Sequence, residues 1–131
     1  MKVFFDHNLS PVIARALNEL FKGQHEVVAL RDKFPRTISD IDWITALDRE
    51  GRWIIISGDR RITRNKAEQA AFRASKHIGM FMSPGLFKSP VVKQAERLLA
   101  LWPSIKTAAG IVQGGAMFEL SMSSLKLKQI K

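Results

Sequence analysis

Two acidic residues each follow a short apolar segment, at the point where a buried strand would end. Asp6 follows KVFF at residues 2–5, and Asp59 follows WIIISG at residues 53–58. In a parallel sheet the carboxyl ends of the strands meet at one edge, where ligands bind. We therefore expect Asp6 and Asp59 to lie near each other at that edge.

A third acid, Asp40, opens a predicted helix and would complete a cluster with these two. Carboxylates about 4 Å apart repel by roughly 4 kcal/mol at an effective dielectric constant near 20, so a cluster needs shared protons or a cation. Hard oxygen ligands favour Mg²⁺ or Mn²⁺, which activate water and neutralise charge on a phosphodiester. Asp6, Asp40 and Asp59 are therefore the predicted metal ligands and catalytic residues.

Helix capping is a simpler explanation for some acids. Asp40 and Asp42 follow Ser39 and would favour the positive end of a helix dipole. We prefer this explanation for Asp42, whereas for Asp40 both explanations stay open. Glu68 lies three residues after Asn65, the spacing of a capping box, which we prefer to a metal role. Asp42 and Glu68 are kept only as accessory candidates.

Polar and basic residues beside the acids suggest contacts to nucleic acid. Asn8, close behind Asp6, could hold a phosphate oxygen or a water on the metal, whereas His7 is interpreted as a loop residue. The arginines that follow Asp59 could bind phosphate groups. The predicted substrate-binding residues are Asn8, Arg60, Arg61 and Arg64.

The charge distribution favours the same interpretation. The net charge is +9, and it divides into −1 over residues 1–59 and +10 over residues 60–131. A basic surface attracts phosphate backbones and makes binding depend on salt. Charge that serves solubility alone is the competing explanation.

Composition limits the class of protein. A chain of 131 residues with 46% hydrophobic residues suits one folded domain, predicted here over residues 1–122, with a basic and flexible tail at 123–131. The absence of cysteine excludes disulfides and thiolate metal sites and favours a reducing cytoplasm. No apolar segment is long enough to predict a membrane span.

Apolar segments of strand and helix type alternate along the chain. Strands are predicted at 2–5, 25–30, 52–57 and 77–82, with an edge strand at 114–122. Helices are predicted at 9–23, 39–51, 65–76 and 91–109, the last interrupted near Pro103. This order predicts an α/β fold with a mostly parallel sheet between helical layers. Trp43, Trp53 and Trp102 are predicted core residues.

The segments MKVFFDHNLSP, SDIDWITALDREGRWIIISGDRRITRNKAEQAAF and HIGMFM resemble the PIN-like domain proteins. The resemblance is to the branch related to VapC-type toxins of bacterial toxin–antitoxin pairs, and it covers residues 1 to about 105. Its most specific parts are Asp-x-x-Trp-Ile at 40–44 and Asp-Arg-Arg-Ile at 59–62.

The resemblance implies a three-layer α/β/α fold and a ribonuclease site in which clustered acids hold Mg²⁺ or Mn²⁺. It matches Asp6, Asp40 and Asp59 to those acids, Asn8 to an accessory polar group and Glu68 to a helix acid. RNA would be the substrate and an antitoxin protein the partner, with a homodimer left open.

Two other functions stay open. The chain could be a PIN-like module that binds nucleic acid or protein without turnover. It could also be a phospho-receiver domain, which likewise places an acid at a strand end. That class expects adjacent acids after the first strand and a lysine late in the sheet, so it ranks last.

Overall fold

The computed structural model of the chain describes residues 1–58 and 60–130, except for the side chain of Arg61; Asp59 and Lys131 lie outside it. Within these residues one sheet has the strand order β2-β1-β3-β4-β5-β6, parallel except for the antiparallel pair of β5 and β6. The strands are β1 (Lys2–Phe5), β2 (Glu26–Ala29), β3 (Ile54–Ser57), β4 (Ile78–Met82), β5 (Met117–Leu120) and β6 (Lys128–Ile130).

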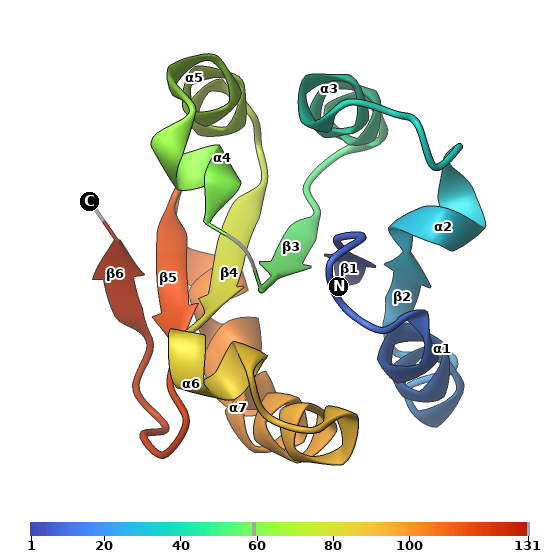
Figure 1. Cartoon of the computed structure of the whole chain (residues 1–131), viewed down its shortest axis with the longest axis vertical. Coiled ribbons are helices and arrows are strands. Elements are labelled where there is room, and N and C mark those ends of the chain that lie inside the picture. The colour runs from blue at the N-terminus through green and yellow to red at the C-terminus, as the bar shows by residue number, and fades with distance from the viewer. Residues whose placement is uncertain (59, 131) are drawn as a thin grey trace.

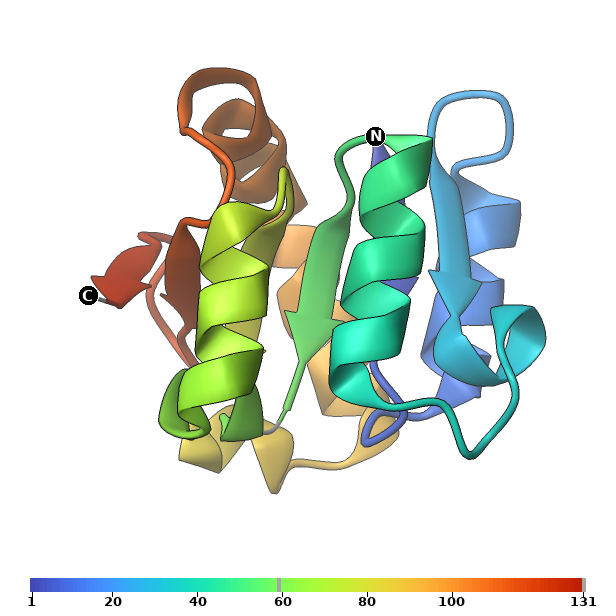
Figure 2. The ribbon, with the colours of Figure 1, turned by 90° about the horizontal axis from the view of Figure 1, so that it is seen from above.

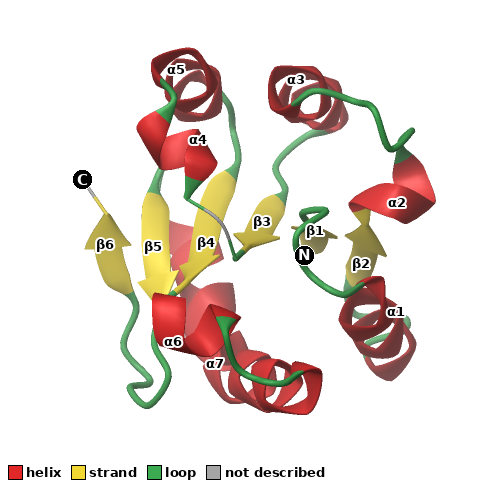
Figure 3. Cartoon of the chain, viewed as in Figure 1, coloured by secondary structure: helices red, strands yellow, loops and turns green. Residues whose placement is uncertain are grey.

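Helices cover both faces of the sheet, which makes three layers (Figure 1). The helices are α1 (Pro11–Leu20), α2 (Leu30–Lys33), α3 (Asp40–Glu50), α4 (Arg61–Arg64), α5 (Lys66–Ala74), α6 (Pro84–Phe87) and α7 (Val91–Ile111). Figure 3 shows α3, α4 and α5 on one side and α1, α6 and α7 on the other. The predicted α/β fold with a mostly parallel sheet is confirmed.

Neighbouring strand residues point to opposite faces and build one apolar core on each side. Phe4 packs on Trp43 of α3, with 4.9 Å between the ring centroids. Phe5 belongs to the other core, together with Trp102 of α7. Trp53 is buried as well, so the three tryptophans are core residues as predicted.

The predicted interruption at Pro103 is wrong, because α7 runs through this residue from Val91 to Ile111. A proline inside a helix cannot donate to the carbonyl group four residues earlier, which here belongs to Leu99. Leu99 is 41% exposed, so water can satisfy that carbonyl group. Although α7 is long, none of the described helices is long and apolar enough to cross a membrane.

The end of the chain differs from the expected flexible tail. Residues 128–130 form β6, which pairs with β5, so β5 is an inner strand and not the predicted edge. Leu127 and Ile130 explain the difference, because their side chains pack against the two cores of the sheet. Short helices α2, α4 and α6 also occupy positions where loops or no separate element were expected.

Candidate metal centre

Asp6 lies at the carboxyl end of β1, between β2 and the end of β3. Its backbone N–H donates to the Ile56 carbonyl group at 2.9 Å, and its own carbonyl group accepts from Leu9 N at 3.1 Å. Figure 2 shows this edge at the bottom of the view, where the loop after β1 lies beside the starts of α3 and α4. The side chain of Asp6 is only 4% exposed.

Hydrogen bonds hold both carboxylate oxygens of Asp6. Oδ1 accepts from His7 N at 2.7 Å and lies 2.8 Å from His7 Nδ1, and Oδ2 accepts from Ser57 Oγ at 3.1 Å. Burial raises the pKa of Asp6, the contacts with His7 oppose that shift, and the charge of Asp40 adds to it. A buried acid of this kind is stabilised in its charged form by a cation.

Asp40 begins α3, and a core residue fixes its side chain. Its Oδ1 accepts a hydrogen bond at 2.9 Å from the indole Nε1 of Trp43, which is fully buried. One potential metal-ligand atom from each of Asp6, His7 and Asp40 lies within 4.8 Å of the other two. The structure thus brings together two of the three predicted acids.

Asp42 has the capping position that the sequence favours. Its N–H donates to Ser39 Oγ at 3.1 Å, and its side chain is exposed. Among the described residues, Asp42 does not belong to the cluster of Asp6, His7 and Asp40. The structure therefore gives Asp42 a place at the start of the helix, outside the candidate metal centre.

Glu68 has the capping position that the sequence favours, and its metal role stays a prediction. Its N–H donates to Asn65 Oδ1 at 3.0 Å, as a cap of α5 requires. Its side chain lines a cavity of about 300 Å³ together with His7 and Asp40. The first turns of α3 and α5 meet at this cavity, so Glu68 stays a candidate acid of the site.

Asn8 connects the loop after β1 to the end of β3. Its Nδ2 donates to Ser57 Oγ at 3.3 Å, and its Oδ1 accepts from Gly58 N at 3.1 Å. The side chain therefore positions the two strand ends relative to each other. A contact between Asn8 and substrate stays a prediction.

The predicted basic residues lie beside this edge. Arg60 pairs with Glu119 of β5, which offsets its charge, whereas Arg64 is exposed on α4. Asp59 and the side chain of Arg61 lie outside the described residues. No local sequence pattern predicts the pair of Arg60 with Glu119, because the two residues are far apart in the chain.

Sequence reasoning treated His7 as a loop residue, and the structure places it in the cluster. The ring is 44% exposed while the neighbouring carboxylate of Asp6 is buried. Adjacency to Asp6 was the only sequence signal for this position. His7 therefore joins the site between the buried Asp6 and solvent.

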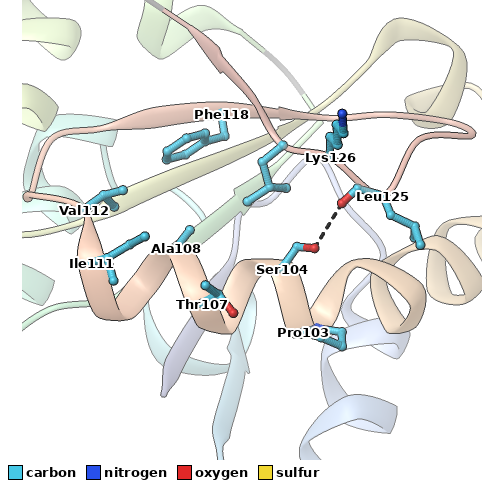
Figure 4. Close-up of a pocket in the computed structure, with 10 residues that line it drawn as sticks. Pro103, Ser104, Thr107, Ala108, Ile111, Val112, Phe118, Leu125 and Lys126 are labelled. Carbon is cyan, nitrogen blue, oxygen red and sulfur yellow. Dashed lines mark hydrogen bonds between the residues drawn. The ribbon is translucent and has the colours of Figure 1, made fainter.

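A separate groove of about 580 Å³ runs between α7 and the segment before β6. Figure 4 shows Ile111, Phe118 and Leu125 around it, with Ser104 Oγ donating to the Leu125 carbonyl group at 3.0 Å. No carboxylate lines this groove, so it is unrelated to the acid cluster.

Comparison with known proteins identifies the family. A family model described as "PIN like domain" matches residues 1–84, which is more than half of the chain. The chain belongs to the PIN-like domain family. No curated protein and no solved structure matches it. The matched region contains Asp6, His7 and Asp40, so the described cluster lies in the PIN-like part, as does Glu68.

PIN-like domains are commonly nucleases, so this chain is a module of nuclease type, which places it among the hydrolases. The resemblance to PIN-like domains is thus confirmed, whereas the branch of VapC-type toxins stays a prediction. The acid cluster lies at the carboxyl edge of the sheet, where a parallel α/β fold places its ligand.

Proposed function

We propose that this PIN-like domain is a ribonuclease that depends on Mg²⁺ or Mn²⁺, with Asp6 and Asp40 as metal ligands. One observation carries the proposal: ligand atoms of a buried acid and a second acid lie within 4.8 Å at the active edge of a PIN-like sheet. Asp59 is the proposed third ligand, since it follows β3 directly in the sequence.

The residues fit a hard divalent cation. Carboxylate oxygens are ligands that Mg²⁺ and Mn²⁺ prefer, and one ligand atom from each of Asp6, His7 and Asp40 lies within 4.8 Å of the others, so these residues could hold such an ion. The burial that raises the pKa of Asp6 fits the same proposal, because a cation bound at this carboxylate would stabilise its charged form.

The residues of the chain would have distinct tasks in RNA cleavage. Ser57 and the His7 backbone orient the carboxylate of Asp6, and Trp43 orients that of Asp40. A bound ion would supply a water of lowered pKa and neutralise charge on the scissile phosphodiester. His7 lies at the exposed side of the cluster, where it could carry a proton between the site and solvent.

A PIN-like module that binds RNA without cleaving it is the second candidate. The hydrogen bonds to both oxygens of Asp6 favour it, since an ion must compete with His7 and Ser57 for that carboxylate. Such a module would bind RNA equally well in EDTA and would leave the strand intact.

Metal binding and RNA cleavage by matched variants separate the two candidates. We expect wild type to bind Mn²⁺ in calorimetry and to cleave RNA, and Asp6→Asn and Asp40→Asn to lose both. Asp42→Asn is the control, because Asp42 lies in the same helix turn as Asp40 but is exposed. It should behave as wild type.

Thermal melting gives a readout that does not depend on turnover. A ligand at ten times its dissociation constant stabilises the folded state by about 1.4 kcal/mol, so Mn²⁺ should raise the melting temperature of wild type and Asp42→Asn. Asp6→Asn should show no such increase. Cleavage that survives in both Asp6→Asn and Asp40→Asn would refute the proposed site.

From the resemblance to VapC-type toxins we further propose a toxin role in the cytoplasm, with RNA as target and an antitoxin as partner; a homodimer is also proposed. Induced expression in a bacterial host tests the toxin role directly. Wild type should arrest growth and Asp6→Asn at equal protein level should not. Equal growth with both proteins would contradict it.

A further inference from the structure

A second cavity opens at the same edge of the sheet, beside Gly58. Its volume is about 390 Å³, a size typical of small-ligand sites. The ends of β3 and β4 meet α4 and α6 there, near the bottom of the view in Figure 2. The residues that line it are Gly58, Arg60, Arg64, Met82, Pro84, Phe87 and Lys88.

An aromatic ring forms one wall, and a glycine determines its place. A Cβ atom at Gly58 would lie 2.1 Å from Cδ1 of Phe87, so the ring lies directly on the backbone at the end of β3. Phe87 N also donates to the Ser83 carbonyl group at 2.9 Å. Because the ring is only partly buried, it offers the cavity a fixed aromatic surface.

Two cations face the same cavity without an acidic partner. Arg60 is neutralised by Glu119, as described above. Arg64 and Lys88 are exposed, and neither forms an ion pair with any residue that the structure describes. The cavity therefore combines one aromatic surface with two positive charges that have no acidic partner among the described residues.

The cavity lies close to the acid cluster. Gly58 N donates to Asn8 Oδ1, and the preceding residue, Ser57, donates to Asp6 Oδ2. A chain of nucleotides that passes the acids could thus reach Phe87 across the end of β3.

We propose that this cavity binds one nucleotide of a single-stranded RNA, its base on Phe87 and its phosphates at Arg64 and Lys88. The inference deepens the proposed ribonuclease function, on which it rests, by assigning a substrate site beside the cluster. Aromatic rings stack on any unpaired base, and cations follow the backbone, so the pocket selects single strands more than sequences.

An acidic peptide is the competing ligand, and the aromatic wall argues against it. Carboxylates would satisfy Arg64 and Lys88 but leave the ring of Phe87 without a partner. A nucleotide engages the ring and both cations at once, because its base and its phosphates are adjacent.

Binding of an eight-nucleotide single-stranded RNA in EDTA tests the site without turnover. We expect Phe87→Ala to bind about five to a hundred times more weakly by fluorescence anisotropy, the usual effect of one base stack. Phe87→Leu should lose as much, because it keeps the apolar packing but not the ring, and Phe87→Tyr should bind as wild type. A duplex of the same sequence should bind more weakly than the single strand.

The salt dependence tests the two cations separately. Arg64→Ala and Lys88→Ala should each reduce the slope of log affinity against log salt by about 0.7, the value for one phosphate of a single strand. Lys22→Ala is the control, since this exposed lysine follows α1 at the opposite edge of the sheet and should leave the slope unchanged.

The outcomes distinguish this site from the proposed function. Wild-type affinity in Phe87→Leu and an unchanged slope in both cation variants would overturn the nucleotide site, whether or not the protein cleaves RNA. Equal affinity for an acidic peptide, lost in the same variants, would also overturn it in favour of a peptide site. Weakened binding by these variants, with no metal-dependent cleavage, would support the pocket while the ribonuclease proposal fails.

Discussion

At the scale of single residues, burial shifts the pKa of two titratable groups, Asp6 and His77, in different parts of the domain. Asp6 is buried beside Asp40, and both burial and the charge of Asp40 raise its pKa. His77 is the counterpart away from the site: it is fully buried, and burial lowers its pKa. A cation would stabilise the charged form of Asp6, whereas the fold depends on His77 remaining neutral.

The hydrogen bonds of His77 explain that dependence. Its Nδ1 accepts from Trp53 N at 3.2 Å, and its Nε2 lies 2.9 Å from the Ile44 carbonyl group, to which it donates. A proton on Nδ1 would remove the bond from Trp53 and place a charge in the core.

We expect this histidine to make the domain less stable in mild acid. Because the folded pKa of His77 is lowered, its contribution is complete above the unfolded pKa of about 6.5 and is lost as the pH falls below it. The free energy of unfolding in urea should therefore fall from pH 7.5 to 5, by at most about 1.4 kcal/mol per pH unit from this group.

The variant His77→Gln isolates this contribution. Gln keeps a donor for the Ile44 carbonyl group but cannot take up a proton, so its unfolding free energy should fall less over the same range. His25, whose pKa is also lowered, titrates in both proteins and cancels in the comparison. Parallel pH curves for the two proteins would contradict the assignment.

At the scale of elements, strand ends and helix starts position the site, and helix α7 shows how packing overrides a local signal. The buried face of α7 includes Leu98, Leu101, Trp102 and Ile105. Apolar burial of this extent stabilises the helix across Pro103, although proline in a helix interior costs about 3 kcal/mol relative to alanine.

Replacement of this proline should therefore stabilise the domain. We expect Pro103→Ala to raise the free energy of unfolding by about 1–3 kcal/mol, since residue 103 regains a donor toward the Leu99 carbonyl group. Pro11→Ala is the matched control, because Pro11 lies in the first turn of α1, where proline is compatible with a helix. It should leave stability unchanged or lower it slightly. A lower stability of Pro103→Ala would show that the ring itself is needed for packing.

At the scale of the whole molecule, the last strand closes the sheet beside β5. Ile130 packs on one core and Leu127 on the other, so β6 covers an edge that would otherwise expose backbone groups. Residues 128–130 are therefore part of the folded sheet, and the exposed Lys128 projects from a strand.

Truncation of one anchoring side chain tests this arrangement. We expect Ile130→Ala to lower the free energy of unfolding by about 1–2 kcal/mol, because the side chain is partly buried. Lys128→Ala on the same strand removes an exposed side chain and should change stability by less than about 0.5 kcal/mol. Equal stability of both variants and wild type in urea unfolding would indicate that β6 contributes nothing to the fold.

The alternation of elements, the buried tryptophans and the position of Asp6 at a strand end could all be predicted from the sequence. These features follow from the spacing of apolar residues and from capping residues, which act over a few positions of the chain. The prediction of a cation site from acids at strand ends has the same origin, and the structure brings Asp6 and Asp40 together as expected.

The side chains that surround those acids could not be predicted in this way, because they come from distant parts of the chain. Glu68 lies in the same cavity as Asp40, Arg60 pairs with Glu119, and Phe87 packs on Gly58. Each contact joins residues from different elements, so it depends on strand order and helix placement. Local sequence patterns cannot predict such contacts, because the free energy of burying a side chain depends on which distant residues the fold packs against it.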